Sequence, residues 1–134
     1  MDILEIEILT GNLDETEKFY SELLGLQTKN KDQNSISFLA GQSTLTFVKS
    51  NKSNPKYHFA FNISHNKFDE AIIWTSAKLG LIKNADNGIV ANFESWNAKA
   101  IYFFDNNGNI LEFIARFDLD NDSTNPSVFH PFNL

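Results

Sequence analysis

Two stretches of this sequence read as copies of one structural unit. A helix-like segment recurs after 55 residues, in the pairs Leu13-Asp14-Glu15 with Phe68-Asp69-Glu70 and Leu24-Gly25-Leu26 with Leu79-Gly80-Leu81. A strand-like segment recurs after 66 residues, as Leu45-Thr46-Phe47 and then Leu111-Glu112-Phe113. Self-similarity on this scale restricts the architecture more than any single motif does, because each copy is expected to fold into the same set of elements.

The first copy predicts a strand, a helix and then further strands. Residues 3–9 alternate between apolar side chains on one side and Glu5 and Glu7 on the other, which is the period of a half-buried strand. Asn12 precedes an acidic first helical turn and is a candidate N-cap, and Gly25 follows the predicted last helical residue, at about Leu24. Residues 35–39 and 44–48 alternate around a turn at residues 40–42, so we expect an antiparallel hairpin. Residues 27–28 begin the second strand if the unit is βαβββ.

The second copy repeats this plan. Its first strand places His58, Ala60 and Asn62 on one side and three apolar residues on the other. Asn66 with Asp69 predicts a second helix cap. Residues 88–93, 99–104 and 109–115 read as strands, and Asp105-Asn106-Asn107-Gly108 predicts a tight turn between the last two. The polar residues 50–55 are the best linker candidate.

Composition narrows the class of protein. The chain has 134 residues, of which 42% are hydrophobic, so a single globular domain with its own core is expected. The net charge is −6 and the basic residues form no cluster, which argues against a nucleic-acid partner. No apolar run is long enough to span a membrane and the first residues lack the pattern of a leader, so we expect a cytoplasmic protein. The sequence has no cysteine, which excludes disulfides and thiolate chemistry.

These residues together resemble the vicinal oxygen chelate superfamily, which includes glyoxalase I, bleomycin-resistance proteins, fosfomycin-resistance enzymes and extradiol dioxygenases. The resemblance covers about residues 3–116 and rests on five segments: residues 12–20, 23–26, 58–61, 95–96 and 104–112. The last is the most specific, although Asn106 and Asn107 stand where the family commonly has Pro and Asp. The resemblance implies an α+β fold in which paired βαβββ modules form a cupped mixed sheet. The modules would span about residues 1–50 and 56–116 of a glyoxalase-like domain, residues 1–116, leaving residues 117–134 as a tail or linker.

The resemblance also implies a metal site. Carried over by position, the metal ligands are Glu5, His58 and Glu112, and the fourth position is Thr46, whose hydroxyl is a poor ligand. Two carboxylates and an imidazole suit a divalent ion such as Fe, Mn, Zn, Ni or Co. Glu112 and Glu7 are then the candidate catalytic residues, with Glu7 as a general base. The expected substrate pocket is lined by Thr46, Trp96, Tyr102 and Phe104.

Each of these residues also has a purely structural interpretation. Glu112 could be balanced by Lys99 or Arg116, and His58 could be a core histidine bonded to a backbone carbonyl. Glu5 could simply lie on an exposed strand face, and the aromatic residues could belong to the core rather than to a pocket. His65 and His130 are expected on the surface.

Three functions follow from these alternatives. The first is a metal-dependent lyase, isomerase, transferase or dioxygenase acting on a small oxygen-rich substrate. The second is a metal-free binding protein of the bleomycin-resistance type, and the third is a regulatory or scaffold module. Thr46 disfavours glyoxalase I itself. The apolar residues 128–134 are expected to pack on the body or on a second subunit, which predicts a homodimer, or else to lead to further modules.

Overall fold

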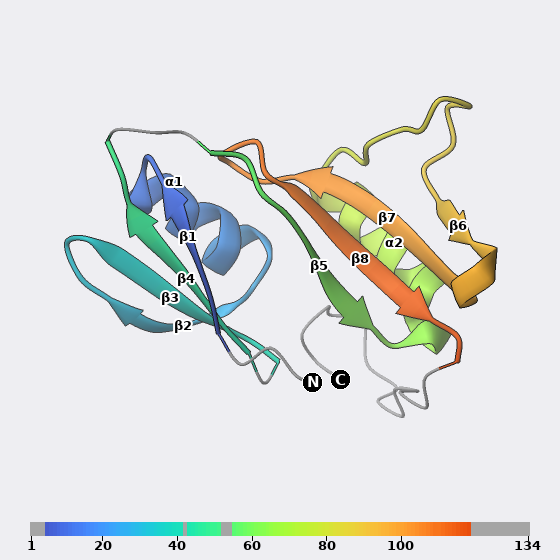
Figure 1. Cartoon of the computed structure of the whole chain (residues 1–134), viewed down its shortest axis with the longest axis horizontal. Helices are drawn as coiled ribbons and strands as arrows, with labels where there is room; N and C mark the ends of the chain where they lie inside the picture. Colours follow the sequence, from blue (N-terminus) through green and yellow to red (C-terminus); the bar gives the residue numbers. More distant parts are fainter. Residues whose placement is uncertain (1–4, 42, 52–54, 119–134) are drawn as a thin grey trace. The chain divides into compact units, whose positions relative to one another are not determined.

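The computed structural model describes residues 5–41, 43–51 and 55–118. The chain forms two compact units, one of residues 1–57 with 105–109 and the other of residues 58–104 with 110–134 (Figure 1). Each unit contains a four-stranded mixed sheet and a helix that follows its first strand. The prediction of two βαβββ modules is therefore confirmed. The expectations for Gln42, residues 52–54 of the linker, His130 and the tail beyond residue 118 fall outside the described residues.

The sheet of unit 1 has the strand order β1-β4-β3-β2. Its strands are β1 (Glu5–Thr10), β2 (Gln27–Lys31), β3 (Ser35–Ala40) and β4 (Ser43–Lys49). β1 runs parallel to β4, and the other two pairs are antiparallel, with an irregularity in β2 between Thr28 and Asn30. The side chains of Phe38 and Phe47 are fully buried on one face. Burial of each contributes about 1.5–3 kcal/mol.

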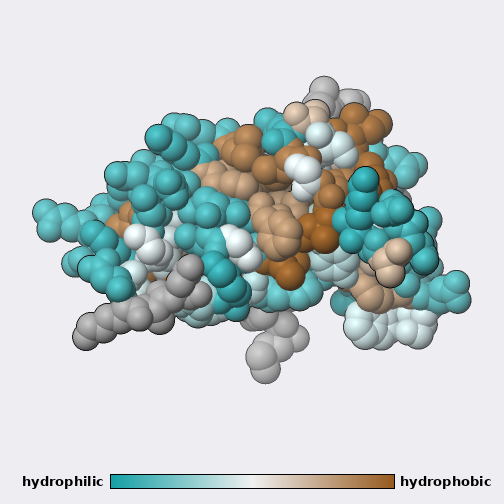
Figure 2. Space-filling model, turned by 90° about the horizontal axis from the view of Figure 1, so that it is seen from above, coloured by the Kyte–Doolittle hydropathy of each residue, from teal (hydrophilic) through white to brown (hydrophobic). Residues whose placement is uncertain are grey.

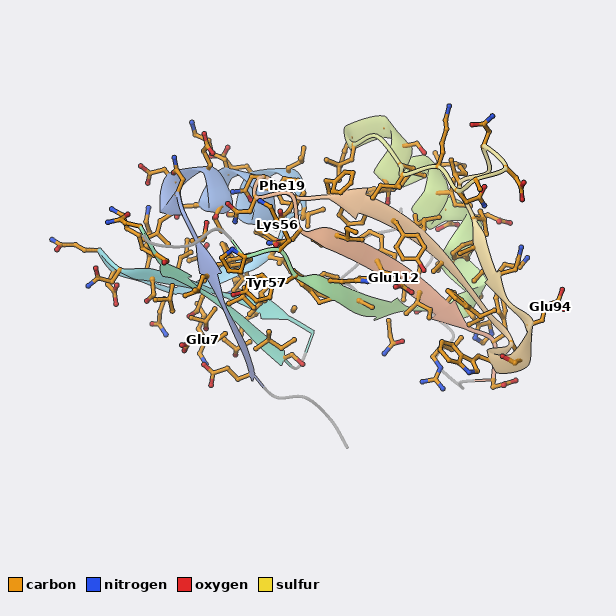
Figure 3. All side chains as sticks on the ribbon, turned by 45° about the horizontal axis from the view of Figure 1, so that its top comes forward. Glu7, Phe19, Lys56, Tyr57, Glu94 and Glu112 are labelled. Carbon is orange, nitrogen blue, oxygen red and sulfur yellow. The ribbon has the colours of Figure 1, made fainter. Side chains whose placement is uncertain are left out.

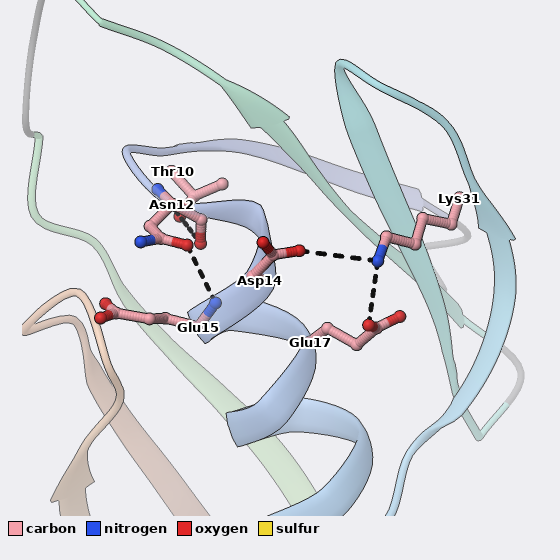
Figure 4. Close-up of polar contacts among 6 residues, drawn as sticks. All are labelled: Thr10, Asn12, Asp14, Glu15, Glu17 and Lys31. Atoms are coloured by element: carbon pink, nitrogen blue, oxygen red, sulfur yellow. Dashed lines mark hydrogen bonds and ion pairs between the residues drawn. The ribbon is translucent and has the colours of Figure 1, made fainter.

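The helix of unit 1 begins as the sequence predicts. α1 (Leu13–Glu17) is capped by Asn12, whose Oδ1 accepts a hydrogen bond from the Glu15 amide at 3.0 Å (Figure 4). The helix continues as a π-helical segment, η1 (Lys18–Leu23), and Gly25 follows with a φ of 81°. Tyr20, in this segment, is completely buried and packs on Phe47 with a ring-centroid distance of 4.7 Å.

The sheet of unit 2 repeats the same order as β5-β8-β7-β6. Its strands are β5 (His58–Ile63), β6 (Ala91–Phe93), β7 (Ala98–Phe104) and β8 (Ile110–Arg116), with β5 parallel to β8. A short 3-10 segment, η3 (Glu94–Trp96), connects β6 to β7. Only the last part of the strand predicted for residues 88–93 forms, since Gly88 precedes β6 in a turn region.

The helix of unit 2, α2 (Phe68–Lys78), starts 55 residues after α1, as the internal repeat predicts. The predicted cap is wrong, however. A 3-10 turn, η2 (His65–Lys67), precedes the helix, so Asn66 lies inside that turn and the N-cap position falls on Lys67, which makes no side-chain capping bond. The extra turn replaces the extended residue that an Asn cap requires.

The loop between β7 and β8 belongs to unit 1 by its contacts. The predicted turn forms there, with the Gly108 amide donating to the Asp105 carbonyl at 3.3 Å and Gly108 at a φ of 80°. Asp105 and Asn109 are buried, and the Tyr20 hydroxyl donates to Asp105 Oδ2 at 2.5 Å. Lys56 donates to the Asn107 carbonyl of the same loop. A polar network centred on Asp105 and Asn109 thus holds this loop in place, because the buried polar groups of these two residues have partners.

Several large apolar side chains remain on the surface (Figure 2). Among the described residues the most exposed are Ile73 on α2, Trp96 in η3 and Phe104 at the end of β7, at 72%, 61% and 52%. All three belong to unit 2. Within the described part of the chain, no helix is both long enough and apolar enough to cross a membrane.

Candidate functional site

Three chemically capable side chains share one face of the unit 2 sheet. Along β8, Leu111 and Phe113 are fully buried on the helix side, and Glu112 alternates to the opposite face, where Figure 3 labels it. Glu112 pairs across the sheet with Tyr102 of β7 and with Ala60 of β5. His58 lies two residues before Ala60 and therefore on the same face.

His58 and Glu112 contact one another directly. The distance between His58 Nε2 and Glu112 Oε1 is 3.1 Å. The Glu112 side chain is only 10% exposed, whereas that of His58 is 54% exposed. A carboxylate that is removed from water requires a compensating donor or cation, and His58 is the partner that the fold supplies.

Tyr102 completes this group, which we call the His58–Tyr102–Glu112 cluster. The Tyr102 and His58 rings meet edge to face with centroids 5.9 Å apart. Partial burial raises the pKa of Tyr102, and the charge of Glu112 and a hydrogen bond to its carboxylate raise it further. The phenol therefore stays protonated at neutral pH, beside the Glu112 carboxylate of the neighbouring strand.

The equivalent positions of unit 1 carry different chemistry. Glu5 pairs with Thr44, two residues before Thr46, just as His58 pairs with Ile110, two residues before Glu112. Glu5 thus occupies the strand position of His58, as the resemblance to the superfamily implies. At the position of Glu112, Thr46 is 7% exposed and its hydroxyl lies 2.8 Å from that of Ser37.

The two acidic residues of β1 are both exposed to solvent. Glu5 begins the strand, and Glu7, labelled in Figure 3, occupies the position that corresponds to Ala60 of unit 2. Both belong to unit 1, while His58 and Glu112 belong to unit 2. Among the described residues, no group of three or more His, Asp and Glu side chains is arranged to hold a metal ion. Within one unit, the structure therefore brings together two of the three expected ligands.

The other expected site residues are placed as follows. Phe104 is on the same face of β7 as Tyr102, and Trp96 stacks on Phe93 with ring centroids 5.4 Å apart. Lys99, considered as a counter-charge for Glu112, points to the opposite face and lies 5.8 Å from the Phe117 ring. His65 also contacts that ring, at 5.6 Å, so it is half-buried rather than a free surface residue.

Described residues of unit 1 line hollows at the start of α1 and along η1. One of about 620 Å³ lies beside the start of α1, where Lys31 forms ion pairs with Asp14 and Glu17 at 3.8 and 2.9 Å (Figure 4). The other, of about 470 Å³, is lined by α1 and η1 residues together with Asn106. The residues that line these hollows do not include His58, Tyr102 or Glu112.

Sequence reasoning did not identify the polar residues that hold the start of β8. The sequence predicted Asp105 only as a turn residue and Asn109 only as the first residue of a strand, yet both are buried and hydrogen-bonded to several partners. The sequence did contain a signal for this role, because Asp105 directly follows the strand β7 and Asn109 directly precedes the strand β8. Such residues bond to the backbone of their own turn.

Comparisons with solved structures agree on the fold. A glyoxalase/bleomycin resistance protein/dioxygenase from Alicyclobacillus acidocaldarius is 21% identical, with 87% of this chain and 92% of that chain covered and a TM-score of 0.70. An integron cassette protein from the mobile metagenome of a Halifax Harbour sewage outfall is 24% identical, with 85% and 97% covered and a TM-score of 0.73. A lactoylglutathione lyase from Agrobacterium tumefaciens is 18% identical, with 85% and 92% covered and a TM-score of 0.70.

No curated protein matches the sequence significantly. The family model described as Glyoxalase/Bleomycin resistance protein/Dioxygenase superfamily, in contrast, matches residues 2–113, which is most of the chain. Together with the two βαβββ modules, this match shows that the chain belongs to the glyoxalase/bleomycin resistance protein/dioxygenase superfamily.

Proposed function

We propose that the protein is a divalent-metal-dependent enzyme that acts on a small oxygen-rich substrate, with His58 and Glu112 as two of its metal ligands. One observation carries the proposal: the imidazole and the carboxylate lie 3.1 Å apart on the open face of the unit 2 sheet, with Glu112 almost buried. Imidazole nitrogen and carboxylate oxygen are suitable donors for Fe, Mn, Zn, Ni and Co.

The third ligand in this proposal is Glu5. It is the exposed carboxylate at the strand position that corresponds to His58, and Thr46, at the position of Glu112, has only a hydroxyl that is already engaged with Ser37. A set of three donors would leave coordination positions for water and for substrate oxygens. The bound ion would supply Lewis acidity to such a substrate.

The residues of the chain have separate tasks. In this proposal Tyr102, which is paired with Glu112 across the sheet, helps to orient the carboxylate. Glu7, two residues after Glu5 on the same face of β1, is the proposed general base. Tyr102, Phe104, Trp96 and Thr46 are the proposed pocket residues. The reaction type is that of a lyase, isomerase, transferase or dioxygenase, but because residue 46 is a threonine rather than a carboxylate, glyoxalase I itself is not the proposed enzyme.

The test is metal content. Protein purified without chelator is expected to carry a stoichiometric divalent ion, measured by mass spectrometry of the metals. His58→Ala and Glu112→Gln are expected to lose it, because the first removes one of only three donors and the second replaces a charged carboxylate by a neutral, weakly binding amide. His65→Ala is the matched control, since it removes a histidine that contacts Phe117 instead. Metal retention in His58→Ala equal to that of the parent would reject the ligand assignment.

A second candidate is a metal-free binding protein. It is favoured by the direct contact of His58 with Glu112, which satisfies both groups without an ion, and by the exposed aromatic ring of Phe104 nearby on the same sheet face. Binding of an apolar, oxygen-bearing ligand that persists in excess chelator and in Glu5→Gln would favour this function over the enzyme.

We also propose that the protein is a homodimer. The proposal rests on the apolar composition of residues 128–134, which the structure does not describe, because such a segment is expected to pack against protein. Light scattering on the full chain and on a version ending at Arg116 tests it. A monomeric full chain would reject the dimer.

A further inference from the structure

We propose that Asn109 is a positioning residue that fixes His58 against Glu112 by setting the register of β5 on β8. The effect on His58 follows from the structure of the strands alone, whereas its consequence for metal affinity rests on the function proposed above. No feature of the sequence motifs assigned such a task to this residue.

The Asn109 side chain is completely buried, and both its oxygen and its nitrogen form hydrogen bonds. Its Oδ1 accepts a hydrogen bond from the Tyr57 amide at 2.9 Å, and its Nδ2 donates to Asp105 Oδ2 at 2.8 Å. Asp105 is fixed in turn, because its Oδ1 accepts from the amides of Asn107 and Asn109 at 2.8 and 2.9 Å. The orientation of the Asn109 amide is thus fully determined by its neighbours.

The hydrogen bond from the Tyr57 amide to Asn109 Oδ1 can set the strand register because of where it lies along the chain. Tyr57 and Asn109 immediately precede His58 and Ile110, which form the first pair of the parallel β5–β8 ladder. The bond from the Tyr57 amide to the Asn109 side chain therefore continues the ladder by one residue beyond its start. Figure 3 shows Tyr57 at the approach to β5.

No hairpin turn fixes the register of this ladder. Two antiparallel strands are aligned by their hairpin turn, but β5 and β8 are parallel and are separated in sequence by α2, β6 and β7. A slip of one residue would turn His58 to the helix-facing side of the sheet. A slip of two residues would keep its facing but move it along β8, away from its contact with Glu112. The Asn109 bond opposes both.

Tyr20 anchors the network to the helical segment η1. Its hydroxyl donates to the same Asp105 oxygen that accepts from Asn109 Nδ2. Tyr20 itself is completely buried among Phe38 and Phe47. Asn109 is consequently held by a residue that cannot move without disturbing the core of unit 1.

The experiment compares Asn109→Ala with Asn106→Ala. Asn106 is the matched control because it is the same residue type in the same loop and donates to Thr16 at 3.1 Å, but it makes no bond to the start of β5. NMR on metal-free protein reports the nuclear Overhauser effect between the His58 and Tyr102 rings, and circular dichroism reports the fold. Calorimetric titration with Zn²⁺ reports affinity.

Asn109→Ala is expected to lose the contact between the two rings and to bind Zn²⁺ about 10- to 100-fold more weakly, as when the support of a metal ligand is removed. Asn106→Ala is expected to keep both. A folded Asn109→Ala protein with an unchanged ring contact would overturn the inference. If the parent binds no Zn²⁺ but Asn109→Ala still loses the contact, the positioning role stands and the metal function falls.

Hydrogen exchange in the unaltered protein keeps the inference testable if Asn109→Ala does not fold. The Tyr57 amide is expected to exchange as slowly as the ladder amides of β5, because it is bonded to a buried side chain. Exchange at the rate of an unbonded amide would overturn the inference.

Discussion

Replacing Tyr20 by Phe removes one buried hydroxyl and nothing else, so it isolates the hydrogen bond to Asp105. The bond is short, at 2.5 Å, and both residues are buried. A hydrogen bond to a charged group contributes about 1.5–3 kcal/mol to stability. Asp105 Oδ2 retains one donor, Asn109 Nδ2 at 2.8 Å, so no oxygen is left without a partner.

We therefore expect Tyr20→Phe to lower the free energy of unfolding by about 1.5–3 kcal/mol. For a chain of this size the loss corresponds to a Tm lower by roughly 5–15 °C. Urea denaturation followed by circular dichroism measures the first quantity, and differential scanning calorimetry measures the second. The denaturant dependence of the free energy is expected to stay the same, since the variant folds to the same structure.

Tyr57→Phe is the matched control. The Tyr57 hydroxyl accepts from the Leu9 amide at 3.2 Å in a partly buried position. Because that bond joins two uncharged groups, its loss is expected to cost about 1 kcal/mol or less. Equal stability losses in the two variants, or no loss in Tyr20→Phe, would refute the argument that the Asp105 network supports the fold.

Three further predictions concern stability. Burial, followed by the charge of Asp105, raises the pKa of Tyr20 well above its usual value, so the folded state is expected to lose stability as the pH rises above about 10. Urea titrations across that pH range should show this loss in the parent protein and a smaller loss in Tyr20→Phe. Gly108→Ala places a side chain at a φ of 80° and should cost about 1–2 kcal/mol in the same assay, whereas Gly11→Ala, with open space around it, should cost nothing. Asn12→Ala removes the cap of α1 and should cost about 1 kcal/mol, and an unchanged midpoint would show that the Glu15 amide finds water instead.

The sequence predicted the fold where local signals and the internal repeat agreed. Both helices begin where the 55-residue spacing places them, Asn12 caps the first, and Gly25 follows its end in a left-handed conformation. The alternation of apolar and polar residues predicted the two sides of β1 and β5, and the resemblance to the superfamily assigned His58 and Glu112 to one site, where the structure places them on one face. These features depend on a few neighbouring residues, which is why they can be read directly.

Features set by distant residues were missed. Asn66 is a residue type that often caps helices, but it lies inside the 3-10 turn η2, and the residue before α2 is Lys67. The bonds of Asp105 and Asn109 join residues far apart in the sequence, Tyr20 and Tyr57, and no local pattern reveals such partners. The direct contact of His58 with Glu112 was likewise not predicted, since the sequence implied only that both residues belong to one site.

The most direct test of the account is Co²⁺ binding at the His58–Glu112 pair. Co²⁺ replaces other divalent ions, and its visible absorption depends on the nitrogen and oxygen atoms that bind it. Titration of the chelator-treated protein is expected to saturate at a single ion per chain, and Glu112→Gln and His58→Ala should each abolish the absorption band while His65→Ala retains it. A parent protein that develops no band, or a band that survives in both Glu112→Gln and His58→Ala, would contradict the account.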